Sequence, residues 1–555
     1  MNCISKLILN NLKFYLTSYI GIFAAVAVGS AVITGALLVG DSVQKSLKQT
    51  ALQRVGWTTF ALSSGEKTFN FSLAQRFKNA IQQSNYSEPL NVSAAIKLSG
   101  TVVKSDSSLR ANKVNVFGVK SDFFSSASNT FSKIENGSAI VNKALAEHLN
   151  LKIGDEIIAR IKKHSLSLLE IPLTLQENIV SGMRLRVQII VSDNQMGNFS
   201  MQVSQTPPLN LFINYDELAK TAEMENRANL LVCNFNSDKY KPDLLDTALN
   251  KSLTPDDCQI EVGLPITNTI EIRSKNIFLE PELCNAARNL TRSNYWQQVV
   301  QSNTIEVLTY LANLLKYKDY STPYSIVTAA TSPFVDENIK EDEIIIIEWL
   351  AEDLHVKPGD VIQMQYFLPE SASKLIEATN QFKVAKIIPH ILPWFDRTLL
   401  PEIPGLAKAE STQDWNLGFP LIYKFRKKDD DYWKNYRGTP KAFLSLSAGK
   451  KIWSNRFGEL TSIRFQLRSG NYDKTIIEKL GNDLIRICPP KTLGFAFEPI
   501  KENALKAAAQ SQDFGGLFIG FSFFLILAVI FLTMLLFQLN LERRMPEIAT
   551  YFAMG

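Results

Sequence analysis

Residues that build metal centres and nucleophilic sites are scarce in this sequence. Its 555 residues include only four histidines and five cysteines. The histidines are His148, His164, His355 and His390. None has a histidine partner at i,i+4 or a cysteine couple beside it, as a local zinc site requires. We therefore expect no metal site.

The signatures of soluble enzymes are missing as well. There is no G-x-S-x-G elbow, and the cysteines stand in no recognisable nucleophile motif. The stretch SLSAGKK has the Gly-Lys pair of a P-loop, but Leu444 replaces its first glycine and Lys451 replaces the Ser/Thr that would hold magnesium. We expect a chain that is no enzyme and that carries no catalytic residue and no cofactor of its own.

An excess of charge of one sign is also absent. Lys and Arg number 59 against 54 Asp and Glu, and no basic block stands out, so we expect no nucleic-acid partner. The chain is nonetheless apolar for one in which 20% of the residues are charged. Two long uncharged runs near its ends account for this.

The first uncharged run extends from Phe14 to Gly40, longer than the ~20 residues that a helix needs to cross a bilayer. We expect residues 17–40 to span a membrane. A cleaved signal peptide is the alternative, but it would have a shorter apolar centre followed by a small-x-small site, which LLVGDSVQKSL does not offer.

The second uncharged run extends from Phe514 to Leu541, and it is longer than an ordinary buried core helix. We expect residues 514–541 to span the membrane too. Before the first run, apolar residues recur at helical spacing, which predicts an amphipathic interfacial helix over 1–16. These apolar residues are Ile4, Leu7, Ile8, Leu12 and Tyr15.

Basic residues flank both spans on their outer sides. Lys6 and Lys13 precede the first span, and Arg543 and Arg544 follow the second. By the positive-inside rule, both termini should be cytoplasmic and residues 41–513 extracytoplasmic. We expect a multi-pass protein of the cell (inner) membrane that is in contact with membrane lipid.

Four of the cysteines fall in the extracytoplasmic segment. They are Cys233, Cys258, Cys284 and Cys488. An oxidising compartment would permit disulfides, but a domain of this size does not need them, so free buried thiols fit equally well. Their spacing does not fix a pairing.

Two closely similar stretches stand 205 positions apart. LAEHLNLKIGDEI at 145–157 and LAEDLHVKPGDVI at 350–362 are identical at eight of thirteen positions, and each reads as a helix, a Gly-Asp turn and a strand. A strand-helix-strand pattern follows each of them, at 211–235 and 442–465. We expect a duplicated module whose two similar lobes can shift relative to each other; the alternative is two unrelated lobes with a common turn.

These patterns predict an α+β fold class, with two transmembrane helices flanking a large extracytoplasmic domain of two similar lobes. We place lobe 1 at 41–240, a connecting region at 241–335 and lobe 2 at 336–513, because residues 240–304 are poorly periodic. The Pro/Trp-rich stretch 389–436 inside lobe 2 cannot be a regular helix. We expect its aromatic residues to pack it down as a long loop, and the alternative is a contact surface for a partner.

Small residues recur every four positions in the first span and form two helix faces. One face has Gly21, Ala25 and Gly29, and the other has Ala27, Ala31 and Gly35. Faces of this kind allow close helix contact, whereas the Phe and Leu of the second span suit contact with lipid. The two spans are therefore expected to belong to a larger bundle.

The last fifteen residues are LERRMPEIATYFAMG. A long span followed by a basic pair, then Glu-Ile-Ala and a glycine, resembles the FtsX-like permease family of ABC transporters, which includes MacB-type and lipoprotein-releasing permeases. The layout is similar as well, and ALAEHLNLKIGDEI resembles a helix-turn-strand of the MacB-like periplasmic core domain of that family. DRTLLPEIPGL and DYWKNYRGTPKAF resemble segments of a subgroup with large ectodomains.

The resemblance implies that residues 542–555 begin a cytoplasmic coupling helix, which docks on a separate ABC-family ATPase subunit that binds ATP. The residues that match its pattern are Arg543, Arg544, Glu547, Ile548 and Gly555. Met545, Ile548 and Phe552, at i, i+3 and i+7, would form an apolar stripe for a partner groove. An ordinary juxtamembrane helix is the alternative. Pro546 suits an N-terminal position in this helix.

The resemblance further implies a permease subunit that couples ATPase action to rearrangement of the extracytoplasmic domain, for transport by export or extraction. The cargo would be lipophilic, a peptide, a lipoprotein or another envelope partner. Family members continue into further spans, so we expect a fragment or a split-gene half that needs a second permease half or a homodimer. The alternative is a signalling or scaffold protein that regulates an envelope enzyme through its ectodomain.

Overall fold

The computed structural model describes most of the chain, as a mixture of helices and strands. The described residues are 3–84, 86–106, 108–124, 133–163, 180–202, 204, 206–371, 374–403, 405–406, 409–417, 421–468, 474–510 and 514–554. They fall into two compact units. The helix unit comprises residues 1–56, 198–207 and 499–555, and the β-rich unit comprises residues 57–197 and 208–498.

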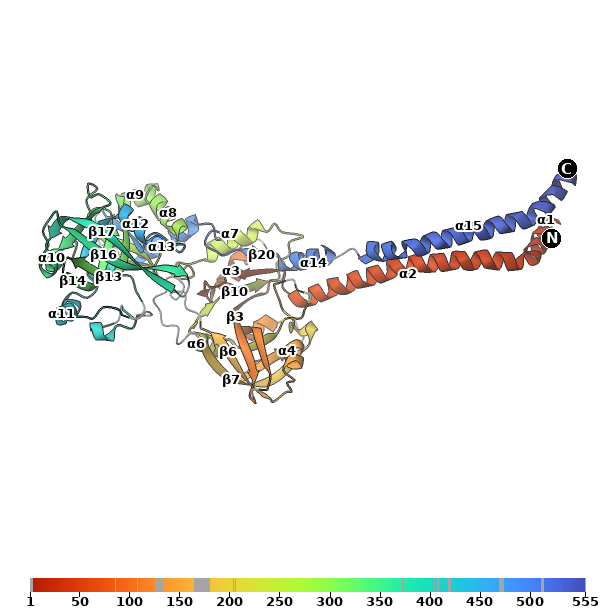
Figure 1. Cartoon of the computed structure of the whole chain (residues 1–555), viewed down its shortest axis with the longest axis horizontal. Helices are drawn as coiled ribbons and strands as arrows, with labels where there is room; N and C mark the ends of the chain where they lie inside the picture. Colours follow the sequence, from red (N-terminus) through yellow and green to blue (C-terminus); the bar gives the residue numbers. More distant parts are fainter. Residues whose placement is uncertain are drawn as a thin grey trace. The chain divides into compact units, whose positions relative to one another are not determined.

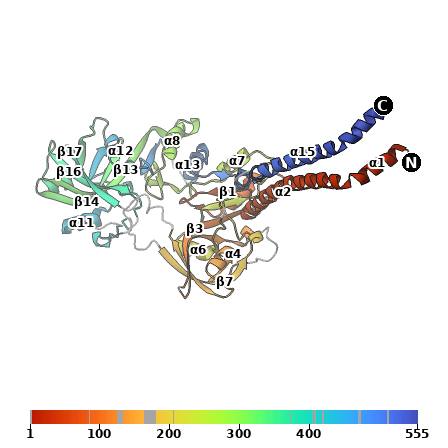
Figure 2. The same ribbon diagram turned by 45° about the vertical axis from the view of Figure 1, so that its right-hand side comes forward.

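Four helices form most of the helix unit. They are α1 (Cys3–Phe14), α2 (Leu16–Val55), α14 (Ile500–Gln510) and α15 (Phe514–Met554). Both α2 and α15 contain a stretch that is long and apolar enough to cross a membrane. Figures 1 and 2 show α2 and α15 side by side, with α1 and both ends of the chain at the same end of the pair.

Both long helices continue beyond the predicted spans. After Gly40, α2 extends through a charged stretch to Val55, because that stretch is rich in Gln, Lys, Leu and Ala, which favour helix. The sequence suggests a new helix with Pro546 near its start, but α15 is continuous and Pro546 lies inside it. The proline removes one backbone donor without ending the helix, since good helix formers surround it.

Two nine-stranded sheets form the body of the β-rich unit. The first, in spatial order, consists of β20 (Phe497–Glu498), β1 (Phe60–Ser63), β10 (Leu230–Cys233), β3 (Val92–Lys104), β4 (Arg110–Val119), β8 (Asn210–Asn214), β5 (Ser138–Asn142), β7 (Val180–Val191) and β6 (Glu156–Lys162). The second consists of β11 (Ile260–Ile266), β12 (Thr269–Ser274), β19 (Ser462–Leu467), β13 (Val300–Tyr317), β14 (Tyr320–Ala330), β18 (Ala442–Ser445), β15 (Glu343–Ile347), β17 (Lys374–Ile388) and β16 (Val361–Ser371). A small sheet pairs β2 (Phe69–Asn70) with β9 (Arg227–Ala228).

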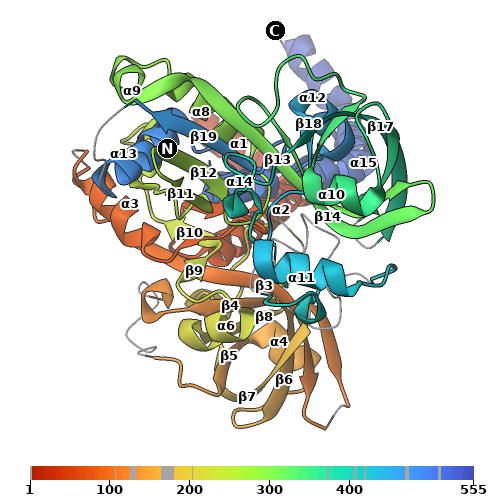
Figure 3. The same cartoon turned by 90° about the vertical axis from the view of Figure 1, so that its left-hand side faces the viewer.

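The two large sheets share one topology. β4 pairs with β8 in parallel, as β14 does with β18, and β5 pairs with β7 in parallel, as β15 does with β17. Additional pairings of β3 with β6 and of β13 with β16 close six strands of each sheet into a barrel. Figure 3 shows the strands of the first barrel in orange and yellow. The matching strand order supports a duplicated module, because two unrelated lobes would have no reason to share it.

The repeated stretch of sequence is the same turn built twice. In each copy the backbone turns left-handed just after the helix and again at the glycine: φ is 48° at Asn150, 56° at His355, 94° at Gly154 and 100° at Gly359. The aspartate after each glycine accepts a hydrogen bond from the backbone N–H three residues before it. Glycine adopts the values of 94° and 100° with the least strain, and a carboxylate caps the turn, so this local geometry explains the identical Gly-Asp pair in both copies.

Helices cover the sheets at matching points in the two repeats. The first repeat has α3 (Leu73–Gln82), α4 (Lys143–His148), α6 (Tyr215–Ala222) and α7 (Asp243–Ser252), with 3-10 turns at Ser121–Phe124 and Asp193–Gln195. The second has α8 (Pro281–Leu290), α9 (Asn294–Val299), α10 (Glu348–Leu354), α11 (Lys427–Tyr436), α12 (Leu446–Trp453) and α13 (Lys474–Ile487), with 3-10 turns at Arg397–Leu399 and Thr412–Asp414. In each repeat the first helix packs against the last, α3 against α7 and α8 against α13.

The structure differs from the predicted lobe boundaries. Residues 241–335 are no simple connection, because they contain α7 and four strands of the second sheet, β11 to β14. A register shift between Gly263 and Ile266 interrupts the pairing of β11 with β12. The strand therefore lacks the regular alternation of apolar and polar residues that would predict it from the sequence. The predicted end of lobe 2 also differs, since α14 belongs to the helix unit.

The apolar cores divide the β-rich unit in another way than the repeats do. One core belongs to the first barrel alone and includes Ile96, Ile157 and Leu185. The other extends from Phe77 on α3 through α7 into the whole second repeat. Part of the first repeat thus shares a core with the second. The first barrel, and not a complete lobe, is the part with its own core.

Candidate functional site

One of the two small-residue faces of α2 packs against α15. Ala25 and Gly29 are buried, and Gly21 lies next to Leu536. A Cβ atom placed on Gly29 would lie 2.5 Å from Cγ1 of Val529, so the two helices touch where the side chain is missing. Close backbone approach of this kind is what small residues permit in membrane helices.

The other small-residue face remains uncovered. Ala27, Ala31 and Gly35 are exposed, and a Cβ atom on Gly35 would meet no described heavy atom within 4 Å. The sequence indicates both faces equally well. Only the packing of the helix pair separates them.

The predicted coupling residues lie on different faces of the last turns of α15. The apolar stripe of Met545, Ile548 and Phe552 is open to solvent, with exposed fractions of 58%, 37% and 84%. Arg544 instead faces the corner between α1 and α2. Gly555 lies outside the described residues.

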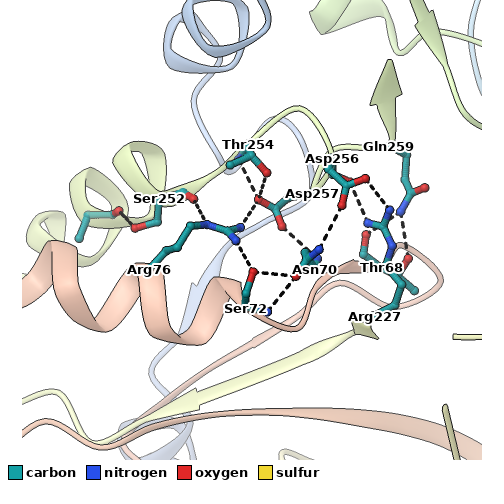
Figure 4. Close-up of polar contacts among 11 residues, drawn as sticks. Thr68, Asn70, Ser72, Arg76, Arg227, Ser252, Thr254, Asp256, Asp257 and Gln259 are labelled. Atoms are coloured by element: carbon teal, nitrogen blue, oxygen red, sulfur yellow. Dashed lines mark hydrogen bonds and ion pairs between the residues drawn. The ribbon is translucent and has the colours of Figure 1, made fainter. Parts of the chain in front are cut away.

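A polar network in the β-rich unit surrounds two adjacent carboxylates in the loop after α7 (Figure 4). The side chain of Asp257 is fully buried and accepts a 2.6 Å bond from Nη2 of Arg76 on α3. It also accepts from the backbone N–H groups of Asn70, at 2.9 Å, and Thr254, at 2.8 Å. These bonds hold the loop against the first repeat.

The neighbouring Asp256 joins the two repeats. Its Oδ1 accepts from Nη2 of Arg227 in the first repeat at 2.9 Å and from Nζ of Lys275, just after β12 in the second, at 2.5 Å. Burial alone would raise the pKa of Asp256, but the Lys275 hydrogen bond and the Arg227 charge outweigh it and lower the pKa. The carboxylate therefore stays charged, as a bridge between two cations must. Sequence reasoning missed this network, because its members are scattered along the chain.

A cavity of about 370 Å³ lies beside the network, lined by both repeats. Its polar lining residues include Lys67, Asp257, Cys258 and Glu280. Lys67 is paired with Glu280 at 2.8 Å, and burial raises the pKa of the Cys258 thiol well above its usual value. A protonated thiol is a poor nucleophile, so Cys258 is not activated in this cavity.

The cysteines of the β-rich unit carry free thiols: Cys233, Cys258, Cys284 and Cys488. Burial raises the pKa to about 12 for Cys233 and Cys284 and to about 11 for Cys488. Of the two alternatives that the sequence leaves open, disulfides and free thiols, the structure has free thiols. Cys233, Cys284 and Cys488 are buried and act as small apolar core residues, whereas Cys258 is half-buried.

None of the described histidines belongs to a cluster of metal-ligating side chains. His148 and His355 are exposed, and His390 packs 4.5 Å from the ring centroid of Tyr436. His164 lies outside the described residues. Within the described part of the chain, no group of three or more His, Cys, Asp or Glu is placed to hold a metal ion.

The Pro/Trp-rich stretch is packed down by its aromatic residues, as expected. Trp415, Tyr432 and Trp433 are buried, and Nε1 of Trp433 donates to the Ala409 carbonyl at 3.0 Å. Part of the stretch is helical, since α11 lies within it. Pro404 and Pro420 lie outside the described residues.

A buried lysine lies under α11. The ammonium group of Lys441 is 4.5 Å from the ring centroid of Trp349 and 4.6 Å from that of Tyr432. Burial lowers the pKa of Lys441 to about 7, although the charge of Asp429 acts in the opposite direction. The lysine therefore titrates near neutral pH.

Comparison with known proteins gives little further information. No protein-family model matches the chain, and its sequence matches no curated protein. Among solved structures, the periplasmic region of MacB from Actinobacillus actinomycetemcomitans is similar at 12% identity and a TM-score of 0.21, over 36% of this chain and 84% of that one. This is a weak likeness in structure, and it establishes neither the family nor the function of the chain.

Proposed function

We propose that this chain is a permease subunit of an ABC transporter, which couples a cytoplasmic ATPase subunit to a large extracytoplasmic domain. The observation that carries the proposal is the exposed stripe of Met545, Ile548 and Phe552 at the end of α15. An apolar stripe on a helix next to a basic pair suits a groove on a protein partner in the cytoplasm. ATP binds to that partner, and this chain has no catalytic role.

The connections between the two units support a mechanical role. Only residues 56–59 separate α2 from β1, and only Pro499 separates β20 from α14. β1 and β20 are neighbours in the first sheet, with Ala61 opposite Glu498. A movement of the helix pair would therefore reach the β-rich unit through neighbouring strands at the β20 edge of the first sheet, as well as through the chain on either side of residues 198–207.

The topology that follows is a multi-pass inner-membrane protein with both termini in the cytoplasm. A second permease half, or a second copy of the chain, completes the bundle, and the cargo is lipophilic, a peptide or a lipoprotein. Protease treatment of intact spheroplasts tests the topology. We expect cleavage inside residues 57–498 and protection of a tag fused after Gly555; cleavage of the tag alone would contradict the topology.

Co-purification tests the docking stripe. The chain should retain an ABC-family ATPase when extracted in mild detergent, and Ile548→Asp or Phe552→Asp should reduce that yield at least tenfold, because each places a charge in an apolar contact. Survival of the complex in both variants would overturn the assignment of the stripe.

Met554→Asp is the matched control. Met554 is 77% exposed on the same helix. It lies about 180° around the helix from Met545, at about 100° per residue. The new charge would thus face away from the stripe, and we expect the ATPase to be retained.

A further inference from the structure

The last turns of α15 have a second face, opposite in character to the exposed stripe. Asn540, Arg544 and Glu547 follow one another at spacings of four and three residues, and Arg544 and Glu547 lie next to residues of α1, α2 and the corner between them. Asn540 is buried and Arg544 is half-buried. This polar face holds α15 to its neighbours in the helix unit.

Arg544 makes most of the contacts on this face. Its Nη2 donates to Oδ1 of Asn11 on α1 at 3.0 Å and to the hydroxyl of Tyr19 on α2. The guanidinium carbon lies 4.7 Å from the ring centroid of Tyr15 and 5.2 Å from that of Tyr19. The neighbouring Arg543 makes only a 3.4 Å contact with Ser18.

The target of Arg544 is the corner where α1 turns into α2. Tyr15 is the single residue between the two helices, and only 9% of it is exposed. The carboxylate of Glu547 also acts on the hydroxyl of Tyr15, so the cation and the carboxylate of α15 both lie at the same residue. Charge-assisted hydrogen bonds and cation–π contacts are each stronger than ordinary surface contacts, and here they act together.

We infer that Arg544 is a positioning residue, which fixes the end of α15 to the α1–α2 corner. When a docked ATPase moves the exposed stripe, α1, α2 and α15 then move together as one body. Without this contact, the last turns of α15 could bend instead. This transmission of movement rests on the proposed docking of an ATPase. The contact of Arg544 with Asn11, Tyr15 and Tyr19, which we call the clamp, does not depend on that docking.

Hydrogen exchange of the purified full-length chain in detergent tests the clamp without any ATPase. In Arg544→Met, amides of residues 3–14 should exchange about tenfold faster than in the wild type, because α1 loses its tie to α15. Amides of α2 around Gly29 should not change. Arg543→Met is the matched control and should change the exchange of α1 less than about twofold, since its contact is longer and weaker. Unchanged exchange of α1 in Arg544→Met would overturn the clamp.

A second measurement separates positioning from docking. With the ATPase bound, Arg544→Met should keep the same affinity, because the stripe is intact, while stimulation of ATP hydrolysis by the chain falls at least fivefold. Arg544→Lys should restore part of the stimulation, since lysine keeps the cation over the tyrosine rings. Full stimulation in Arg544→Met would overturn the transmission step. If the wild-type chain binds no ATPase, the proposed function fails, and the exchange result on α1 still decides the clamp.

Discussion

Arg464 on β19 and Asp396 in the loop after β17 form a buried ion pair, with 2.5 Å between Nη1 and Oδ2. Nε of Arg464 also donates to Glu271 on β12 at 2.8 Å, and Nη2 donates to Oγ1 of Thr398 at 2.8 Å. The three charged side chains are at most 4% exposed. Arg464 thus anchors the start of the Pro/Trp-rich stretch to the second sheet.

Replacing Arg464 with methionine would leave two buried carboxylates without their cation. We expect Arg464→Met to lower the free energy of unfolding by about 3–5 kcal/mol, the usual cost of breaking a buried pair. In the control, Arg273→Met removes a more exposed pair with Glu261 and should cost about 1 kcal/mol or less. Chemical denaturation of the purified chain, followed by tryptophan fluorescence, measures both. Equal losses of unfolding free energy in the two variants would contradict the argument that burial makes the Arg464 pair more costly to break.

Lys441 should make the stability of the β-rich unit depend on pH. Its pKa is about 7 in the fold, against 10.5 for an ordinary lysine. Between these values the unfolded chain holds a proton that the folded chain lacks, so raising the pH stabilises the fold. We expect the free energy of unfolding of the wild type to rise from pH 7 to pH 10 relative to that of Lys441→Met.

Denaturation curves at several pH values measure this difference. Lys427→Met, which changes an exposed lysine on α11, serves as the control and should follow the wild type. Parallel pH profiles for the wild type and Lys441→Met would contradict the buried titration.

Gly29 should be the position where α2 is least tolerant of a side chain. Gly29→Ala places a methyl group against Val529 and should weaken the contact between α2 and α15 by about 1–3 kcal/mol, the usual cost of overpacking. Gly35→Ala adds the same group in open space and should have little effect. Thermal unfolding in detergent measures both variants. Val529→Ala should rescue Gly29→Ala; failure of the rescue would mean that another contact limits the packing.

Asp257 should contribute more stability than its neighbour Lys275. Asp257→Ala leaves Arg76 and the N–H groups of Asn70 and Thr254 without their acceptor, for which we expect a loss of about 1–3 kcal/mol. Lys275→Met removes a partly exposed pair and should cost about 1 kcal/mol or less. Denaturation of the full chain compares the two. A larger loss for Lys275→Met would reverse the order of importance within the network.

The duplicated module could be predicted from the sequence because its signal is local. Gly154 and Gly359 adopt φ values that few other residues tolerate, and the aspartate after each caps the turn. These local requirements are the same in both copies, so both copies have the same residues at these positions. The strands β11 to β14 leave no such trace, because the tendency of a segment to form a strand depends on the partner strands it pairs with as well as on its own residues.

The candidate site could be predicted only in part. The i, i+3, i+7 spacing correctly groups Met545, Ile548 and Phe552 on one exposed face. The family resemblance assigns Arg544 to the docking helix, but the structure turns its side chain inward, toward Asn11, Tyr15 and Tyr19. Those three residues are more than 500 positions away in the chain, beyond the reach of any local pattern.

The sequence by itself determined the two apolar helices, the repeated turn and the apolar stripe, because each depends on the spacing of neighbouring residues. Only the tertiary structure decided which small-residue face of α2 is covered, where the apolar cores divide, and which charges meet at Asp256, Arg464 and Arg544. Contacts between distant segments carry these features, and their energies depend on burial, which the order of residues does not state.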